Sequence, residues 1–248
     1  MKNIIIILVT ANCCNSAFAQ DFLSQQRKFA GVRTALSEKE QMIADNLQKH
    51  GLSVDAVNIL ITIYKAEKQL EIYAKKKNEN VYIRIAIYNI CALSGKLGPK
   101  RKQGDRQVPE GFYHIDRFNP ASNFYLSLGI NYPNPSDKIK SAVQHPGGDI
   151  FIHGSCATIG CLPMTDDKIK EIYLYAVYAR NNGQKNISVY LFPFRMTDIN
   201  FDGYKNQHAK NQELIDFWTN LKIGYNEFVS EHKALNVAVD TKGNYLFK

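Results

Sequence analysis

Apolar side chains recur at every second position in three successive stretches of the first half of the chain, 59–64, 70–75 and 81–87. This period of two is typical of β-strands, in which neighbouring side chains point to opposite faces. Polar residues 65–69 separate the first two stretches and indicate a turn. The pattern therefore predicts a β-meander, and shorter apolar runs predict further strands at 112–117, 124–128, 149–152 and 187–192.

Apolar residues at helical spacing predict one helix from Thr165 to about Gly183 and another over 214–228. Residues 21–50 are expected to be helical in two pieces, with a capping-box pair at Ser37 and Glu40. We interpret 131–137 as a loop, 194–210 as a connector, and 235–239 with 245–247 as a terminal hairpin. The expected fold is mainly β with flanking helices (α+β). It comprises an N-terminal helical segment at 20–51, a β domain at 52–194 and a C-terminal extension at 195–248.

Residues 1–19 have the features of a secretory signal peptide. A basic start at Lys2 precedes an apolar run over residues 4–9, and Ala17-Phe18-Ala19 forms an A-x-A cleavage site. The apolar run is too short to span a bilayer. We therefore expect export to the periplasm or cell envelope, with no membrane span left after cleavage.

Charge narrows the class of partner. Lys and Arg number 31 against 23 Asp and Glu, a formal net charge of +8 that indicates an acidic partner or surface. For an exported protein we expect an anionic polymer of the envelope rather than nucleic acid. Many basic residues lie between Gly95 and Gly111, a glycine- and proline-containing stretch that we interpret as a long exposed loop.

The segment 144–173 carries the candidate chemistry. A short apolar strand delivers His153 and Gly154 to its end, a loop with Cys156 and Cys161 follows, and the helix begins near Thr165. Three alternatives fit this spacing. The first is a cysteine nucleophile with a histidine base. The second is a zinc site that adds His145 to the three residues, and the third is a local disulfide between the two cysteines. The mature chain would hold three cysteines, an odd number, so at least one thiol is free or pairs with another molecule.

The nucleophile hypothesis makes two further expectations. A thiol with an ordinary pKa of about 8.5 gains thiolate character next to an imidazolium or a helix N-terminus, and the loop offers both to Cys161. Gly160 allows a substrate carbonyl to come close, so the backbone N–H groups of Gly160 and Cys161 are candidates for an oxyanion hole.

Three motifs stand in a set order: Val108-Pro109-Glu110-Gly111-Phe112-Tyr113, Ile152-His153-Gly154 and Thr158-Ile159-Gly160-Cys161. Over about 59–194 the chain thereby resembles the L,D-transpeptidase catalytic domain family (YkuD type). The resemblance implies a β-sandwich or barrel, no metal and no organic cofactor. It implies that Cys161 is the nucleophile, that His153 is its base, and that the Gly154 carbonyl orients the imidazole. Family members attack the amide between an L-centre and D-alanine in a peptidoglycan stem peptide and form a thioester.

Departures from the usual motif leave the acyl acceptor open. The loop between His153 and Cys161 is short, and Ile159 and Pro163 replace polar residues that are frequent in the family. This pattern is closer to a divergent branch that includes hydrolases. An amine acceptor gives an L,D-transpeptidase, whereas water gives an L,D-carboxypeptidase or an amidase that releases a wall-attached protein. A non-catalytic wall-binding module with the same fold is the alternative from another class.

Each remaining candidate residue also has an interpretation without a function in the site. Arg106 in the basic loop, Thr158 in the cysteine motif and His114 on a predicted strand are expected to contact substrate, although the charge can simply be solvated and His114 can be a core or surface residue. Cys156 is expected to be a packed accessory thiol or to bridge to Cys91. His145 is expected to be a loop residue.

Overall fold

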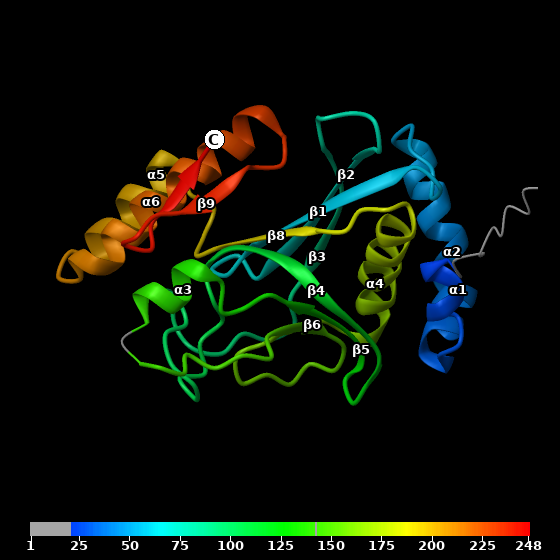
Figure 1. Ribbon diagram of the computed structural model, residues 1–248, viewed down its shortest axis with the longest axis horizontal. Coiled ribbons are helices and arrows are strands. Elements are labelled where there is room, and N and C mark those ends of the chain that lie inside the picture. Colours follow the sequence, from blue (N-terminus) through cyan, green and yellow to red (C-terminus); the bar gives the residue numbers. More distant parts are fainter. Residues whose placement is uncertain (1–20, 142) are drawn as a thin grey trace, which may run out of the picture.

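The computed structural model describes residues 21–141 and 143–248 (Figure 1), so the predicted signal peptide lies outside the described residues. Its centre is a mixed sheet of eight strands in the order β3-β2-β1-β8-β4-β5-β6-β7. β1–β3 form the predicted antiparallel meander, while β8 pairs in parallel with β1 and β7 in parallel with β6. The strands are β1 Val57–Tyr64, β2 Gln69–Lys76, β3 Ile83–Asn89, β4 Gly111–Ser122, β5 Tyr125–Ile130, β6 Phe151–His153, β7 Leu162–Pro163 and β8 Ser188–Phe192.

Helices cover both faces of the sheet. On one face α4 (Asp166–Asn181) packs against β1 and β5, and α1 (Phe22–Gln26) and α2 (Ala30–Lys49) pack against α4. The other face meets α5 (Asp198–Gln207), α6 (Gln212–Glu231) and the hairpin of β9 (Val237–Val239) and β10 (Tyr245–Phe247). Figure 1 shows these two groups at opposite ends of the long axis. The expected mainly β, α+β class with flanking helices is confirmed.

The alternation in β1 explains the two apolar cores. Ile59, Ile61 and Ile63 belong to the core that contains α4, whereas Leu60 and Tyr64 belong to the aromatic core under α6. All five are 0–1% exposed. A strand that is buried on both faces carries apolar residues at odd and even positions alike.

Three short elements differ from the sequence prediction. The expected loop at 131–137 already begins α3 (Pro135–Lys140), which Asn134 caps in a capping box with Asp137. The connector at 194–210 contains α5, capped by Thr197. Ser37 lies inside α2 and caps nothing, because the helix starts seven residues earlier, at Ala30. Within the described residues no helix is both long and apolar enough to cross a membrane.

Candidate active site

His153 is the last residue of β6 and is only 2% exposed. It lies between Ser127 of β5 and Pro163 of β7 in the sheet register. Its Nδ1 atom is 2.5 Å from the carbonyl oxygen of Gly154. Because a carbonyl oxygen only accepts, Nδ1 carries the proton of the neutral ring, which leaves Nε2 with a free lone pair. Burial lowers the pKa of His153, and the Gly154 hydrogen bond opposes this shift.

Cys161 immediately precedes β7 and lies on the same face of the sheet as His153. The register sets Ile152 opposite Leu162 and His153 opposite Pro163. Since side chains alternate along a strand, Ile152 and Leu162 point into the core while His153 and Cys161 point the other way. The Cys161 thiol is free, half-buried, and 3.5 Å from the carbonyl oxygen of Asp149. The structure thus places the predicted imidazole at the end of β6 and the predicted sulfur just before the adjacent β7.

The expectation of a lowered thiol pKa was wrong. Burial raises the pKa of Cys161; the backbone of Phe151 lowers it and the Asp149 carboxylate raises it further, while the Lys100 ammonium lowers it. The loop buries the sulfur, which disfavours the charged form. Taken with the lowered pKa of His153, these surroundings favour a neutral thiol at Cys161 and a neutral imidazole at His153. The pair is suited to general-base activation when substrate is bound, and a standing thiolate–imidazolium pair is disfavoured.

Thr158 organises the backbone before the cysteine. Its hydroxyl accepts the N–H of Gly160 at 3.1 Å and of Cys161 at 2.8 Å, and donates to the Cys161 carbonyl at 2.9 Å. The two N–H groups expected to form the oxyanion hole therefore converge on one point, which the hydroxyl oxygen occupies. Gly160 has φ +142°, a conformation that favours glycine.

A disulfide joins Cys91 to Cys156, with Cα atoms 5.5 Å apart. This excludes a disulfide between Cys156 and Cys161, and it excludes a zinc site that uses the Cys156 thiolate. Of the two roles expected for Cys156, the bridge to Cys91 is the one observed. The backbone N–H of Cys91 donates to the Pro163 carbonyl at 3.0 Å. The bridge thereby ties the loop between His153 and Cys161 to the end of β3.

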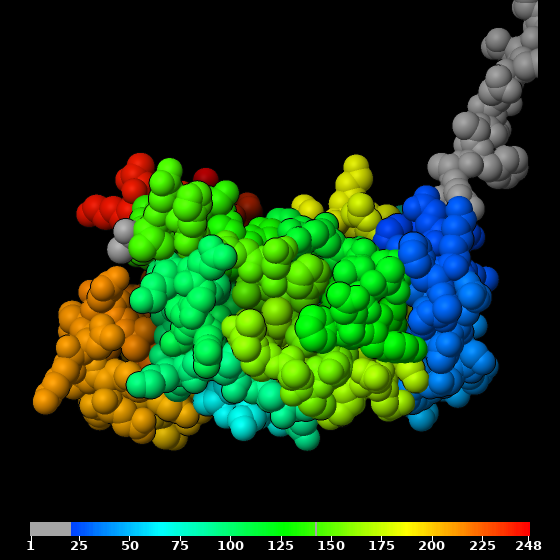
Figure 2. Space-filling model, turned by 90° about the horizontal axis from the view of Figure 1, so that it is seen from below, coloured from blue at the N-terminus to red at the C-terminus, as the bar shows by residue number. Residues whose placement is uncertain are grey.

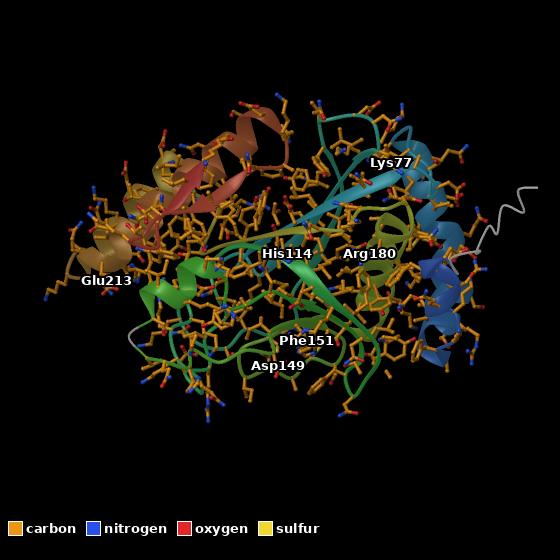
Figure 3. All side chains as sticks on the ribbon, viewed as in Figure 1. Lys77, His114, Asp149, Phe151, Arg180 and Glu213 are labelled. Atoms are coloured by element: carbon orange, nitrogen blue, oxygen red, sulfur yellow. A yellow bond between two sulfur atoms is a disulfide. The ribbon has the colours of Figure 1, made fainter. Side chains whose placement is uncertain are left out.

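Of the other predicted substrate contacts, His114 lies apart from this pair, whereas Arg106 lies on a loop next to the cysteine loop. His114 of β4 is half-buried, and the hollows that it lines are bounded by the β9 hairpin and by α1 rather than by His153 or Cys161. Figure 3 shows His114 well separated from Asp149 and Phe151, which lie beside each other. Arg106 is exposed, with φ +56°, on a loop whose residues lie beside the cysteine loop on the face shown in Figure 2. His145 is exposed in a loop, as expected.

Sequence reasoning missed two neighbours of the site. The Phe124 ring, 46% exposed at the tip of the β4–β5 hairpin, lies 4.7 Å from the His153 ring between centroids. Arg117 of β4 pairs with Asp149 at 2.8 Å and lies over the Phe151 ring at 4.7 Å. Neither residue belongs to a motif, and only strand pairing brings them to the site. No pattern in the sequence could have indicated them.

The motif residues fall within a known family. A sequence model of the YkuD family, described as the L,D-transpeptidase catalytic domain, matches residues 58–185, more than half of the chain. The chain belongs to the L,D-transpeptidase catalytic domain family. The resemblance stated from the sequence is thereby confirmed. Both His153 and Cys161 lie inside the matched range.

Individual proteins are also similar to this chain. The chain is 38% identical over 190 residues to the Escherichia coli K12 protein named "Putative L,D-transpeptidase YafK", covering 76% of this chain and 73% of that one. Among solved structures, the helical cell shape determining protein Pgp2 of Campylobacter jejuni has a TM-score of 0.44 at 17% identity, covering 74% of each chain. Bdellovibrio bacteriovorus Bd1075 has a TM-score of 0.40 at 19% identity, covering 64% of this chain and 56% of that one.

Proposed function

We propose that this L,D-transpeptidase family member is an exported enzyme that modifies peptidoglycan through a cysteine acyl-enzyme. Its substrate is the amide between an L-centre and D-alanine, or an equivalent amide, in a stem peptide. Cys161 is the nucleophile and His153 its general base. The single observation that carries the proposal is that His153 ends β6 while Cys161 directly precedes the adjacent β7 on the same face, with the His153 Nδ1 proton directed to Gly154.

The reaction balances without a cofactor. His153 Nε2 takes the thiol proton as sulfur bonds to the carbonyl carbon, and the developing oxyanion replaces the Thr158 hydroxyl as the acceptor of the Gly160 and Cys161 N–H groups. The carbon–nitrogen bond then breaks, and the imidazolium gives its proton to the departing amine of D-alanine. A thioester remains on Cys161. An amine acceptor resolves it as a transpeptidase, and water resolves it as a hydrolase.

The setting of the proposed reaction follows from charge and from the N-terminus. A net charge of +8 suits an anionic wall polymer, and the signal peptide expected at 1–19 would direct the chain to the envelope. Stem peptides are the proposed partner, and a wall-attached protein becomes one if the enzyme is an amidase.

Mass spectrometry of muropeptides after incubation with the purified protein tests the proposal. A dimer joined between the diamino acids that form the L-centres of two stem peptides identifies a transpeptidase. Loss of D-alanine alone identifies a carboxypeptidase, and release of a wall-attached protein identifies an amidase. Cys161→Ala is expected to abolish turnover and His153→Ala nearly to do so. Full activity in Cys161→Ala would refute the nucleophile. Unchanged muropeptides with retained sacculus binding would instead favour a wall-binding module.

A further inference from the structure

Arg117 lies on the same face of the sheet as the candidate catalytic pair. The register sets Arg117 of β4 opposite Gly129 of β5, and Gly129 opposite Phe151 of β6. Directly paired residues point to the same face, and so do residues two apart on one strand. Arg117, Phe151 and His153 therefore share a face, which is also the face of Cys161.

Gly129 gives the arginine a path across β5. A Cβ atom at position 129 would come within 2.9 Å of both Arg117 Nε and Asp116 Oδ1, so glycine leaves room for these two side chains in their present positions. Across this gap the guanidinium reaches the Phe151 ring at 4.7 Å and the Asp149 carboxylate at 2.8 Å. Asp149 in turn contacts the Cys161 sulfur through its carbonyl. Asp149 therefore contacts both groups: its carboxylate contacts the guanidinium, and its backbone carbonyl contacts the sulfur of the nucleophile.

The ion pair between Arg117 and Asp149 is exposed enough for another carboxylate to replace Asp149. The Arg117 side chain is 43% exposed and that of Asp149 is 82% exposed. The Arg117 Nε atom also lies 3.2 Å from Asp116 Oδ1, at the opposite side of the fork from the Nη1 atom that Asp149 holds. An ion pair this exposed contributes little, so an incoming carboxylate can replace Asp149. Lys100, the cation that lowers the pKa of the Cys161 thiol, is 6% exposed and is held by Asp105 at 2.6 Å. Lys100 is therefore committed within its own loop.

We propose that Arg117 binds a carboxylate of the stem peptide, with Asp149 holding the guanidinium until substrate arrives. This inference rests on the proposed function, because it assumes a peptide substrate. The planar guanidinium suits two parallel hydrogen bonds to a carboxylate. The Phe151 ring supports the guanidinium from beneath, as an aromatic face does for a cation.

Binding without turnover tests the inference. Titration calorimetry measures the affinity of a tetrapeptide stem for Cys161→Ala protein, alone and combined with a second substitution. Arg117→Gln is expected to weaken binding roughly tenfold, because a charge-assisted hydrogen bond is lost. Asp149→Asn, which removes the competing carboxylate, is expected to tighten binding roughly threefold. Arg180→Gln is the matched control: it also lies against an aromatic ring, that of Phe22, but far from Asp149 (Figure 3).

Two modified peptides identify the carboxylate. One carries an amide at its terminal D-alanine and the other an amide on the side-chain carboxyl of its diamino acid. The difference in affinity between the Cys161→Ala protein and the same protein with Arg117→Gln added is expected to disappear with the peptide that lacks the bound carboxylate. Equal affinity of both proteins for the unmodified peptide would overturn the inference.

A second variant tests the site without removing the arginine. The Cys161→Ala background separates the carboxylate-site inference from the enzymatic proposal. Gly129→Ala keeps every charge but obstructs the path of Arg117, and it is expected to weaken binding in the same way. Because the Cys161→Ala background cannot turn over, Arg117-dependent binding survives even if the wild-type protein proves inactive. In that case the enzymatic proposal fails alone. Arg117-independent binding by an active enzyme overturns only the carboxylate site.

Discussion

The backbone N–H of Cys161 donates to the hydroxyl oxygen of Thr158 at 2.8 Å. The same oxygen accepts the N–H of Gly160, and the hydroxyl proton goes to the Cys161 carbonyl. One side chain thus holds the last turn of the loop before the nucleophile. The position of the sulfur relative to His153 depends on this turn.

Thr158→Val is therefore expected to lower kcat roughly tenfold, because a hydroxyl that satisfies three backbone groups is replaced by a methyl group. Thr158→Ser keeps the hydroxyl and is expected to retain most of the activity. Steady-state kinetics of the two variants, with circular dichroism to confirm folding, make the comparison. An unchanged kcat in Thr158→Val would show that the loop is held by other contacts.

The acid limb of the pH–rate profile is expected below pH 6.5. His153 must be neutral to accept the thiol proton, and burial lowers its pKa. Activity should therefore persist to more acidic pH than an ordinary histidine, with a pKa of about 6.5, would permit. The measurement is kcat/KM as a function of pH. A midpoint above 6.5 would contradict a buried neutral base.

The same shift makes a prediction about stability. As the pH falls, the unfolded chain takes up a proton at its histidine before the folded protein does. The free energy of unfolding contributed by His153 is therefore present above about pH 6.5 and is lost as the pH falls through the lower folded-state pKa. Urea titrations of wild-type and His153→Gln protein between about pH 7.5 and about pH 5 measure this. The free energy of unfolding should depend less on pH in the variant.

Alkylation of Cys161 reports the charges around the sulfur. The Asp149 carboxylate raises the thiol pKa, so Asp149→Asn is expected to lower this pKa and speed iodoacetamide labelling at neutral pH. Lys100→Met removes a charge that lowers the pKa and should slow labelling. Asp202→Asn, on the exposed side of α5, is the control. Peptide mass spectrometry assigns the label to Cys161, and identical rates in all variants would contradict these electrostatic effects.

Much of this arrangement could be predicted because it is local in sequence. Period-two stretches gave β1–β3, helical spacing gave α4 and α6, and the spacing of His153 and Cys161 gave the candidate pair. The misses are of two kinds. β7 has only two residues and shows no period of its own, while the path of Arg117 over Gly129 depends on the pairing of three strands. Such relations arise from tertiary structure and leave no repeat in the sequence.

The Cys91–Cys156 bridge is expected to support stability more than chemistry. It closes a loop of 65 residues, for which chain entropy gives a stabilisation of about 4 kcal/mol as an upper value. The Cys91→Ser/Cys156→Ser protein is expected to lose a large part of this stabilisation, as measured by urea unfolding. It is expected to retain substantial turnover at about 25 °C. Complete loss of activity in a folded double variant would show that the bridge positions the catalytic loop.

A buried ion pair just before β4 connects the start of that strand to α6. Lys65 Nζ and Glu110 Oε1 are 2.8 Å apart with side chains 3% and 0% exposed, and Glu110 also accepts the indole N–H of Trp218. Lys65 donates in addition to the carbonyls of Gly98 and Val108, so the basic loop depends on the same ammonium group.

Glu110→Gln is expected to cost about 3–5 kcal/mol of unfolding free energy, because it leaves the buried Lys65 ammonium without a counter-charge. Glu79→Gln is the matched control: its pair with Lys76 is about half exposed and should contribute less than about 1 kcal/mol. Chemical denaturation of the two variants measures both values. Since Glu110 holds β4, the loop at 95–107 and α6 at one point, its loss should also loosen the basic loop, seen as faster amide hydrogen exchange there. Equal stability of the two variants would show that the buried pair contributes no more than the exposed one.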